Sequence, residues 1–325
     1  MKKSLSLFFA VLLALTFIIS GCSNKASQAS SNKPVHVRIG HYGGTCDAAT
    51  YVAYEKGYFK KNGLDVELVK VDFNTLKDGI GTGKIDAVNA SPGLFKPIEQ
   101  GLNIKLVDGI HTGCIQGVVP VNSPIKSIKD LKGKTIGVDA IGGVPMVLLS
   151  MELSQNGIDP KKDVTWKVYP DPQLEQAIDK GEIDAFVNWD PFGEQYIESG
   201  KGRKIFGNNH DGDPNNQYCC FVGINGKLVK ENPEVAKAIA NSYAEADKWI
   251  EGHQEETAQL EVDKKYIPGD VELNAKLLKS YEFVSDKERA KKSFTTIVTS
   301  MKQQKILDPS TDVNTFVNNV FVDLK

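Results

Sequence analysis

The sequence has few cysteines, no excess of either charge, and none of several short enzyme motifs. Five cysteines among 325 residues are too few for a small domain held together by disulfides, because such domains are dense in cysteine. A formal net charge of −2 provides no basic surface for nucleic acid or for an anionic membrane. No Gly-x-Ser-x-Gly, P-loop or His-Glu-x-x-His pattern occurs, so these catalytic signatures are absent from the sequence.

Long apolar runs are also scarce, and the one present lies at the N-terminus. Lys2 and Lys3 precede an almost unbroken apolar stretch over residues 5–19, and Cys22 follows it in the run Ile-Ser-Gly-Cys. This arrangement predicts a secretory signal over residues 1–21. It resembles a bacterial lipobox, in which Cys22 is acylated and becomes the mature N-terminus. A plain signal peptide with an incidental cysteine is the alternative.

Residues 22–34 are rich in Ser, Asn and Lys and predict a flexible tether. After residue 22 no apolar run approaches the roughly 20 residues that a membrane-spanning helix requires. We therefore expect an exported, extracytoplasmic chain that is attached to the bacterial cell membrane through lipid alone. The remaining length suits two domains with cores of their own.

Strands and helices alternate along the rest of the chain. We expect strands over 35–40, 64–71, 85–89, 104–108, 135–138, 164–169, 183–188 and 218–224. Such alternation predicts an α/β fold with doubly wound, mostly parallel sheets. Residues 76–95 and 174–193 share a helix, an Ile-Asp-Ala strand start and a proline-bearing turn, which indicates two similar lobes. Residues 200–216 read as a loop, and the chain after residue 232 reads as amphipathic helices.

The other four cysteines lie on short turns beside glycines. Cys46 and Cys114 follow strand-like runs, and Cys219 and Cys220 are adjacent in the run QYCCFVG. Loops after strand C-termini line the ligand crevice of an open α/β sheet. We therefore expect the four thiols to meet in that crevice and to favour a soft, thiophilic ligand. Two disulfides, in any of three pairings, and burial as small hydrophobes are the alternatives.

Longer motifs carry a family resemblance. The segments AYEKGYFKKNGLDVELV, GTGKIDAVNASP, SPIKSIKDLKGKTIGVD and GEIDAFVNWDPF occur in this order, and the helix NPEVAKAIANSYAEADKWI follows them. Together they resemble the solute receptors of the periplasmic-binding-protein-like class II fold, in the branch for nitrate, sulfonates, taurine and thiamin pyrimidine precursors. The resemblance covers residues 35–325.

The resemblance implies a two-lobed α/β fold with the ligand in the interlobe cleft. One lobe is expected over 35–120 plus 222–325 and the other over 121–221, each built on a doubly wound, mostly parallel sheet. Such a receptor closes on its ligand by hinge motion and delivers it to the permease and ATPase of an ABC importer. We expect a monomer that has no catalytic residues.

The family pattern, carried onto this sequence, assigns ligand contacts to the turns that follow the strands. Ser91 and the pair Gly142-Gly143 lie at predicted helix starts, whose free N–H groups favour an anion. Other members of the set offer aromatic rings or side-chain amides. The expected ligand-binding residues are His41, Tyr42, Gly44, Thr45, Cys46, Ser91, His111, Cys114, Gln116, Gly142, Gly143, Asn188, Trp189, Asp190, Cys219 and Cys220.

Cysteine and histidine on these turns depart from the polar or small residues usual in sulfonate and nitrate receptors. The first ligand hypothesis is a metal, a metal complex or an iron–sulfur species held by the four cysteines as thiolates, with His41 or His111 assisting. Those four metal ligands would be Cys46, Cys114, Cys219 and Cys220. The sequence assigns no other cofactor.

Three further hypotheses stay open. One is a receptor for a small organic sulfonate or pyrimidine, with the cysteines as packing residues. Another is a metal-dependent enzyme, because the Cys-Cys-Phe core of QYCCFVG resembles the cysteine-rich run of pyrimidine-precursor synthases that share this fold and use iron. The last is a receptor regulated by thiol oxidation.

Overall fold

Alternating apolar residues build two mixed β-sheets in the computed structural model, which describes residues 33–208 and 217–324. The predicted signal peptide, the predicted lipidation site Cys22 and the tether before residue 33 lie outside the described residues. Among the residues that are described, no helix combines the length and the apolar character needed to cross a membrane.

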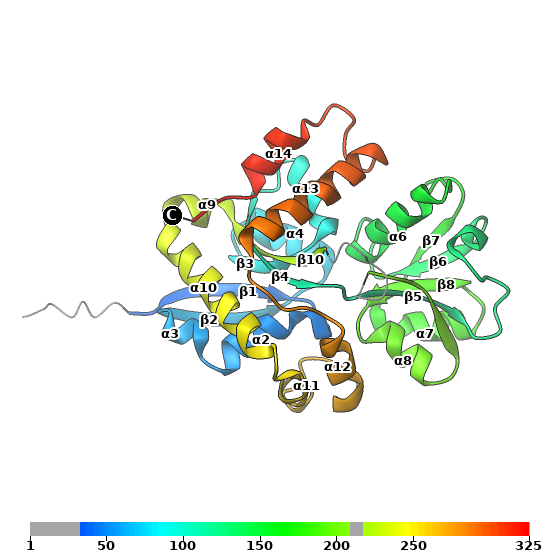
Figure 1. Cartoon of the computed structure of the whole chain (residues 1–325), viewed down its shortest axis with the longest axis horizontal. Helices are drawn as coiled ribbons and strands as arrows, with labels where there is room; N and C mark the ends of the chain where they lie inside the picture. The colour runs from blue at the N-terminus through cyan, green and yellow to red at the C-terminus, as the bar shows by residue number, and fades with distance from the viewer. Residues whose placement is uncertain (1–32, 209–216, 325) are drawn as a thin grey trace, which may run out of the picture. The chain divides into compact units, whose positions relative to one another are not determined.

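The first sheet has five strands within the described residues, in the order β2-β1-β3-β10-β4. β1 pairs in parallel with β2 and β3, whereas β10 runs antiparallel to β3 and β4. The strands are β1 (Val35–His41), β2 (Leu64–Lys70), β3 (Ala87–Ala90), β4 (Ile104–Thr112) and β10 (Tyr218–Asn225) (Figure 1).

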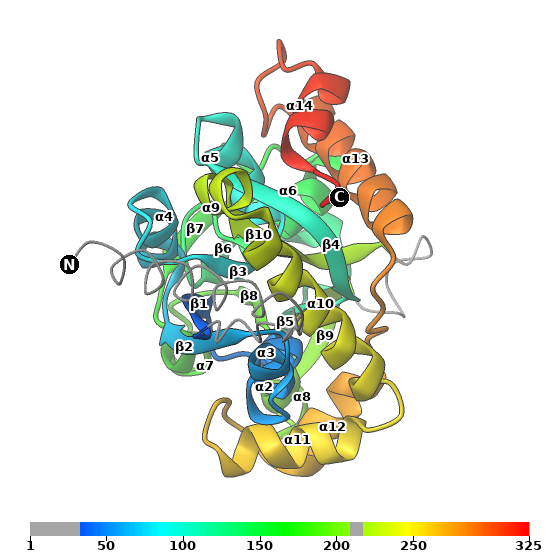
Figure 2. The same ribbon diagram turned by 90° about the vertical axis from the view of Figure 1, so that its left-hand side faces the viewer.

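Side chains that alternate along these strands fill a core on each face of the first sheet. Val37 and Ile39 of β1 belong to one core, and Val88 and Ala90 of β3 belong to the other. Figure 2 shows α10 crossing one of these faces. The helices on that face are α2 (Ala48–Glu55), α3 (Tyr58–Lys61) and α10 (Pro233–Ile250). Those on the other face are α4 (Phe73–Gly81), α5 (Phe95–Glu99), α13 (Lys287–Gln303) and α14 (Val313–Val320).

The second sheet repeats this plan, with the order β7-β6-β8-β5-β9. β6 pairs in parallel with β7 and β8, and β5 runs antiparallel to β8 and β9. The strands are β5 (Ile115–Pro120), β6 (Thr135–Val138), β7 (Thr165–Val168), β8 (Ala185–Trp189) and β9 (Gly202–Gly207). In Figure 1, α6 (Val144–Gln155) covers one face, and α7 (Asp171–Asp179) and α8 (Phe192–Glu198) cover the other.

The chain passes between the sheets at other positions than the sequence predicts. The boundaries at 120/121 and 221/222 are wrong, because β5 is a strand of the second sheet and β10 begins in the first sheet at Tyr218. The first lobe therefore contains β1–β4, β10 and the C-terminal helices, and the second lobe contains β5–β9. The apolar residues of β5 belong to a strand rather than to a linker.

The expected loop over 200–216 also needs correction, because β9 occupies its first part. Gly202 reads as a loop residue, but a Cβ there would lie 2.2 Å from Cδ1 of Tyr196. Glycine is thus required for packing beneath a ring of α8. The first lobe is completed by α9 (Gly226–Glu231), α11 (Gln254–Asp263) and α12 (Val271–Lys279).

Candidate functional site

A β-bulge in β10 directs two successive thiols to the same place. Thr112 pairs with Tyr218 and His111 pairs with Cys220, so Cys219 is the extra residue of the bulge. A bulge interrupts the alternation of side chains along a strand and re-aims the extra one. Both cysteine sulfurs of the bulge consequently lie close to the sulfur of Cys114, which follows β4.

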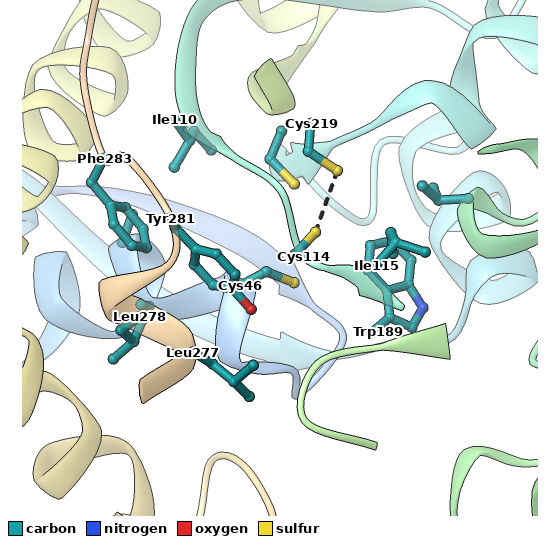
Figure 3. Close-up of a cluster of buried hydrophobic side chains, with 14 of the residues drawn as sticks. Cys46, Ile110, Cys114, Ile115, Trp189, Cys219, Leu277, Leu278, Tyr281 and Phe283 are labelled. Atoms are coloured by element: carbon teal, nitrogen blue, oxygen red, sulfur yellow. Dashed lines mark hydrogen bonds between the residues drawn. The ribbon is translucent and has the colours of Figure 1, made fainter. Parts of the chain in front are cut away.

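Cys46 joins these three residues in a buried group, which we name the thiol cluster (Cys46, Cys114, Cys219 and Cys220). All four are free thiols, and none is more than 3% exposed. The Sγ atoms of Cys114 and Cys219 are 3.3 Å apart. Figure 3 shows the labelled sulfurs turned toward one another among Ile110, Ile115, Trp189 and Tyr281. The structure thus brings together the four cysteines that the sequence assigned to one site.

The sulfur positions form two overlapping groups of three ligands. The Sγ atoms of Cys114, Cys219 and Cys220 all lie within 4.8 Å of one another. The ligand atoms of Cys46, His111 and Cys114 meet the same limit. Cys114 therefore occupies the centre of the thiol cluster.

Hydrogen bonds and burial have opposite effects on the pKa values of the four thiols. The pKa of Cys46 is held well below its usual value, mainly by a hydrogen bond with Cys114 and then by one with Cys220. A hydrogen bond with Cys114 likewise lowers the pKa of Cys219. Burial is the largest influence on Cys114 and Cys220, and it raises the pKa of both. Hydrogen bonding thus favours the charged form at Cys46 and Cys219, and burial disfavours it at Cys114 and Cys220.

His111 lies against the cluster, but both of its ring nitrogens face backbone carbonyl oxygens. Nε2 is 3.0 Å from the carbonyl oxygen of Cys46. Nδ1 is 3.1 Å from the carbonyl oxygens of Thr112 and Gly113. Carbonyls only accept hydrogen bonds, and a neutral imidazole carries one N–H and one lone pair. His111 therefore lies between the Cys46 turn and the turn after β4, and one of its ring nitrogens belongs to the ligand group with Cys46 and Cys114.

Asp190 connects the two lobes beside the thiol cluster. The Tyr281 hydroxyl donates to Oδ2 at 2.5 Å, and Nε2 of Gln116 donates to Oδ1 at 3.0 Å. The Asp190 carbonyl accepts from the Thr45 amide at 3.1 Å. A Cβ on Gly44 would lie 3.1 Å from that carbonyl oxygen, so glycine permits this close approach. Burial raises the pKa of Asp190 to about 8.

A cavity of about 1050 Å³ is lined by residues of both lobes. Tyr42 of the first lobe and Trp189 of the second stack in its wall, with ring centroids 5.3 Å apart and planes at 20°. The Trp189 indole donates to Asp139 at 3.3 Å. Burial, and then the charge of Asp171, raise the pKa of Asp139 to about 7. Lys70 also lines this cavity, whereas the four cysteines lie outside its described lining.

The helix starts that were expected to hold an anion are closed by contact between the lobes. A Cβ on Gly93 would lie 2.8 Å from the amide nitrogen of Val144, in the first turn of α6. Gly143 is the N-cap of this helix, and Gly142 before it has φ of 75°. The buried Ser91 hydroxyl caps no helix and has no hydrogen-bond partner among the described residues. The N-terminus of α6 therefore faces the segment after Ser91.

Two other expected site residues lie away from the thiol cluster. Nδ1 of His41 is 2.9 Å from the Tyr51 hydroxyl, and burial followed by the charge of Lys70 lowers the pKa of His41 to about 4. Asn188 donates from Nδ2 to Asp171 at 3.0 Å. The candidate metal groups of the described residues do not include His41, so the structure does not bring it to the sulfurs.

Sequence reasoning missed three residues of the site. Asp139 directly follows β6, and its place after a strand is a signal that identifies it in retrospect. Asn208 also directly follows a strand, β9, but the sequence predicts a loop in place of that strand, and Tyr281 follows the helix α12. Nδ2 of Asn208 donates to Sγ of Cys219 at 3.1 Å, and its Oδ1 accepts from the Cys114 amide at 3.0 Å. Asn208 thereby supports two members of the thiol cluster.

Two α/β lobes with a buried polar site between them define a solute-binding protein of the periplasmic-binding-protein-like class that serves ABC importers. Residues 30–262 match the NMT1-like family, and the chain belongs to this family. The fold and the family resemblance predicted from the sequence are thus confirmed.

Three comparisons show the extent of the similarity. A binding protein of Brucella abortus (strain 2308) is 29% identical over 286 residues, which cover 85% of each chain. An aliphatic sulfonates-binding protein of Bacillus subtilis is 28% identical over 99% of this chain and 96% of its own. The zinc-bound ligand-binding component of an ABC-type import system from Staphylococcus aureus has a TM-score of 0.73 and 17% identity, covering 89% of this chain and 97% of its own. The last comparison concerns the fold alone.

Proposed function

We propose that the protein is the receptor of an ABC importer and captures a thiophilic solute, a soft metal ion or its complex, at the thiol cluster. The observation that carries this proposal is the convergence of four buried thiols from three separate segments of the chain. Thiolates select soft metal species over hard cations and oxyanions. A core of this size needs no sulfur cross-link, so stability alone gives no reason for the convergence.

Buried amide groups on β3, β5 and β8 disfavour an oxyanion. Three of them leave only their carbonyl oxygens without a described partner: Asn89, Gln116 and Asn188. Their N–H groups donate to the Cys46 carbonyl and to the carboxylates of Asp190 and Asp171. Oxygen atoms repel nitrate or a sulfonate and attract a cation or an N–H donor. The sulfonate chemistry of the Bacillus subtilis relative is therefore not proposed for this chain.

Metal content tests the proposal directly. The full-length protein, purified anaerobically in detergent, is expected to contain a stoichiometric thiophilic metal or a charge-transfer absorption band. Cys114→Ser and Cys219→Ser are expected to lose it, while Thr257→Ser, a change of similar size at a buried position in α11, keeps it. Folded, metal-free protein that takes up no thiophilic metal contradicts the proposal.

A second candidate function is supported by the cavity beside the cluster. The cavity has a volume of about 1050 Å³, and its lining includes Tyr42, Trp189, Asp139 and Asp171. These features suit a small nitrogen-containing aromatic solute such as a pyrimidine, whose N–H groups would donate hydrogen bonds to a carboxylate. Such a compound is expected to raise the thermal midpoint, and Asp139→Asn is expected to reduce that rise. An alkanesulfonate of similar size serves as the control ligand.

We further propose that Cys22 carries the lipid that holds the receptor on the extracytoplasmic face of the membrane, where it meets the permease and ATPase as a monomer. The sequence before residue 33 supports the anchor. Expression of the full-length chain with a labelled fatty acid is expected to label the protein, and Cys22→Ser is expected to abolish the label. Labelled Cys22→Ser protein would contradict the anchor and leave the solute site unaffected.

A further inference from the structure

We propose that Cys114, Cys219 and Cys220 form a trigonal all-sulfur site for a closed-shell monovalent cation of the Cu(I) type, and that Cys46 is not one of its ligands. This inference rests on the proposed function and names the class of its solute. It is narrower than the four-cysteine site expected from the sequence.

The first support is the arrangement of the sulfurs. The three Sγ atoms of the proposed site lie within 4.8 Å of one another, whereas Cys46 meets that limit only in the group with Cys114 and His111. With metal–sulfur bonds of about 2.3 Å, three sulfurs around one metal are separated by about 4.0 Å and four sulfurs by about 3.8 Å. The three sulfurs reach trigonal spacing with small shifts, but a tetrahedral site requires Cys46 to move.

The second support is that the three proposed ligands come from neighbouring segments of the chain. Cys219 and Cys220 are held by the bulge in β10, which is fixed by pairing with β4. Cys114 lies between β4 and β5, and Asn208 bonds both the Cys114 backbone amide and the Cys219 sulfur. All three ligands therefore belong to the two adjoining passages between the lobes. Cys46 belongs to a different segment, the short helix η1 (Thr45–Asp47) before α2.

The third support is the position of the other possible donors among the described residues. His111 belongs to the group with Cys46 and Cys114 and not to the group with Cys219 and Cys220, and both carboxylate oxygens of Asp190 have partners in Tyr281 and Gln116. The remaining neighbours drawn in Figure 3 are mainly apolar, among them Ile110 and Ile115. Zn²⁺ needs four ligands, and a three-ligand zinc site completes its shell with water. A dry, three-sulfur site suits a soft ion that accepts fewer ligands.

Competition between metals tests this inference on the full-length protein under anaerobic conditions. Cu(I) is supplied as its bicinchoninate complex, and Zn²⁺ is supplied against a colorimetric zinc chelator. We expect one equivalent of Cu(I) to be withdrawn from bicinchoninate while Zn²⁺ stays with its chelator. X-ray absorption at the copper edge of the unmodified protein is expected to give three sulfur neighbours, a result that does not depend on any variant folding.

Serine variants distinguish the ligands. C114S, C219S and C220S are each expected to weaken Cu(I) binding by about 100-fold or more, and C46S is expected to retain it within about 3-fold. Circular dichroism establishes which variants are folded before their affinities are compared.

Three results overturn the inference in distinguishable ways. Tight Zn²⁺ binding that depends equally on all four cysteines makes the site tetrahedral and leaves the proposed function intact. Four sulfur neighbours around bound copper likewise retain the function and remove the trigonal assignment. A folded protein that binds neither Cu(I) nor Zn²⁺ contradicts both this inference and the proposed thiol-cluster function.

Discussion

The Asp139 carboxyl shows how a single buried group controls the pH response of the interlobe region. It lines the cavity, accepts from the Trp189 indole and lies near Asp171. Burial and the neighbouring acid raise its pKa from 3.8 to about 7. The folded protein therefore keeps this proton at a pH where the unfolded chain has released it.

Asp139→Asn is expected to remove a decrease in stability that occurs as the pH rises. Between pH 4 and 7 the native carboxyl binds more protons than the unfolded one, so the free energy of unfolding of the wild type falls with rising pH. A shift of this size corresponds to a loss on the order of 4 kcal/mol by pH 8. Urea unfolding of both proteins from pH 4 to pH 8 measures the difference, which is expected to be small at pH 4 and to grow toward pH 8.

His41 provides a control of opposite sign for that experiment. Its pKa is lowered from 6.5 to about 4, so it contributes stability that is present above pH 6.5 and lost as the pH falls toward 4. The stability difference between wild type and His41→Gln is therefore expected to shrink with acidification. A pH-independent difference for Asp139→Asn would contradict the role assigned to that carboxyl.

At the scale of elements, the contact between Gly93 and α6 determines how closely the lobes approach. A Cβ at this position would lie 2.8 Å from Val144 N and 3.1 Å from the carbonyl carbon of Gly143. These are backbone atoms of the second lobe, which cannot move aside as a flexible side chain does. Gly93→Ala is thus expected to hold the lobes apart.

The expected result is a solute affinity lowered by about 10-fold, with a larger radius of gyration in small-angle scattering. Gly81→Ala is the matched control, since a Cβ there would meet only Cδ1 of Leu102 at 3.7 Å. Equal affinities of the two variants would show that the contact does not limit closure.

Most strands and helices could be predicted from the sequence, but the pairing between strands and the contacts between side chains could not. Alternating runs such as VHVRIG and LDVELVKV gave β1 and β2 because one apolar face suffices to indicate a strand. The bulge at Cys219 depends on its register with β4, which no local pattern contains. The sequence could assign the four cysteines to neighbouring loops, but it could not separate Cys46 from the other three or place the His111 ring between backbone carbonyl oxygens. Gly202 illustrates the converse error, since a packing glycine was read as part of a loop.

At the scale of the whole described chain, two kinds of link join the lobes. Tyr281 after α12 donates to Asp190 after β8, and both side chains are buried. Lys276 of α12 forms ion pairs with Glu194 at 2.7 Å and Glu198 at 2.9 Å of α8, and its side chain is 59% exposed. Exposed ion pairs contribute about 0–1 kcal/mol, whereas a buried acceptor that loses its donor costs about 1–3 kcal/mol.

These links are expected to respond differently to salt. Tyr281→Phe is expected to lower the thermal midpoint and the fraction of molecules with closed lobes. Each decrease is expected to be similar at 0.05 and 1 M NaCl, because the Asp190 side chain is buried away from dissolved ions. Lys276→Met is expected to have a smaller effect that disappears at 1 M NaCl, where charges are screened beyond about 3 Å. Calorimetry and small-angle scattering at both salt concentrations measure the two variants. A salt-independent loss in Lys276→Met would mean that α12 holds α8 by packing, and a negligible loss in Tyr281→Phe would remove Asp190 as the buried link between the lobes.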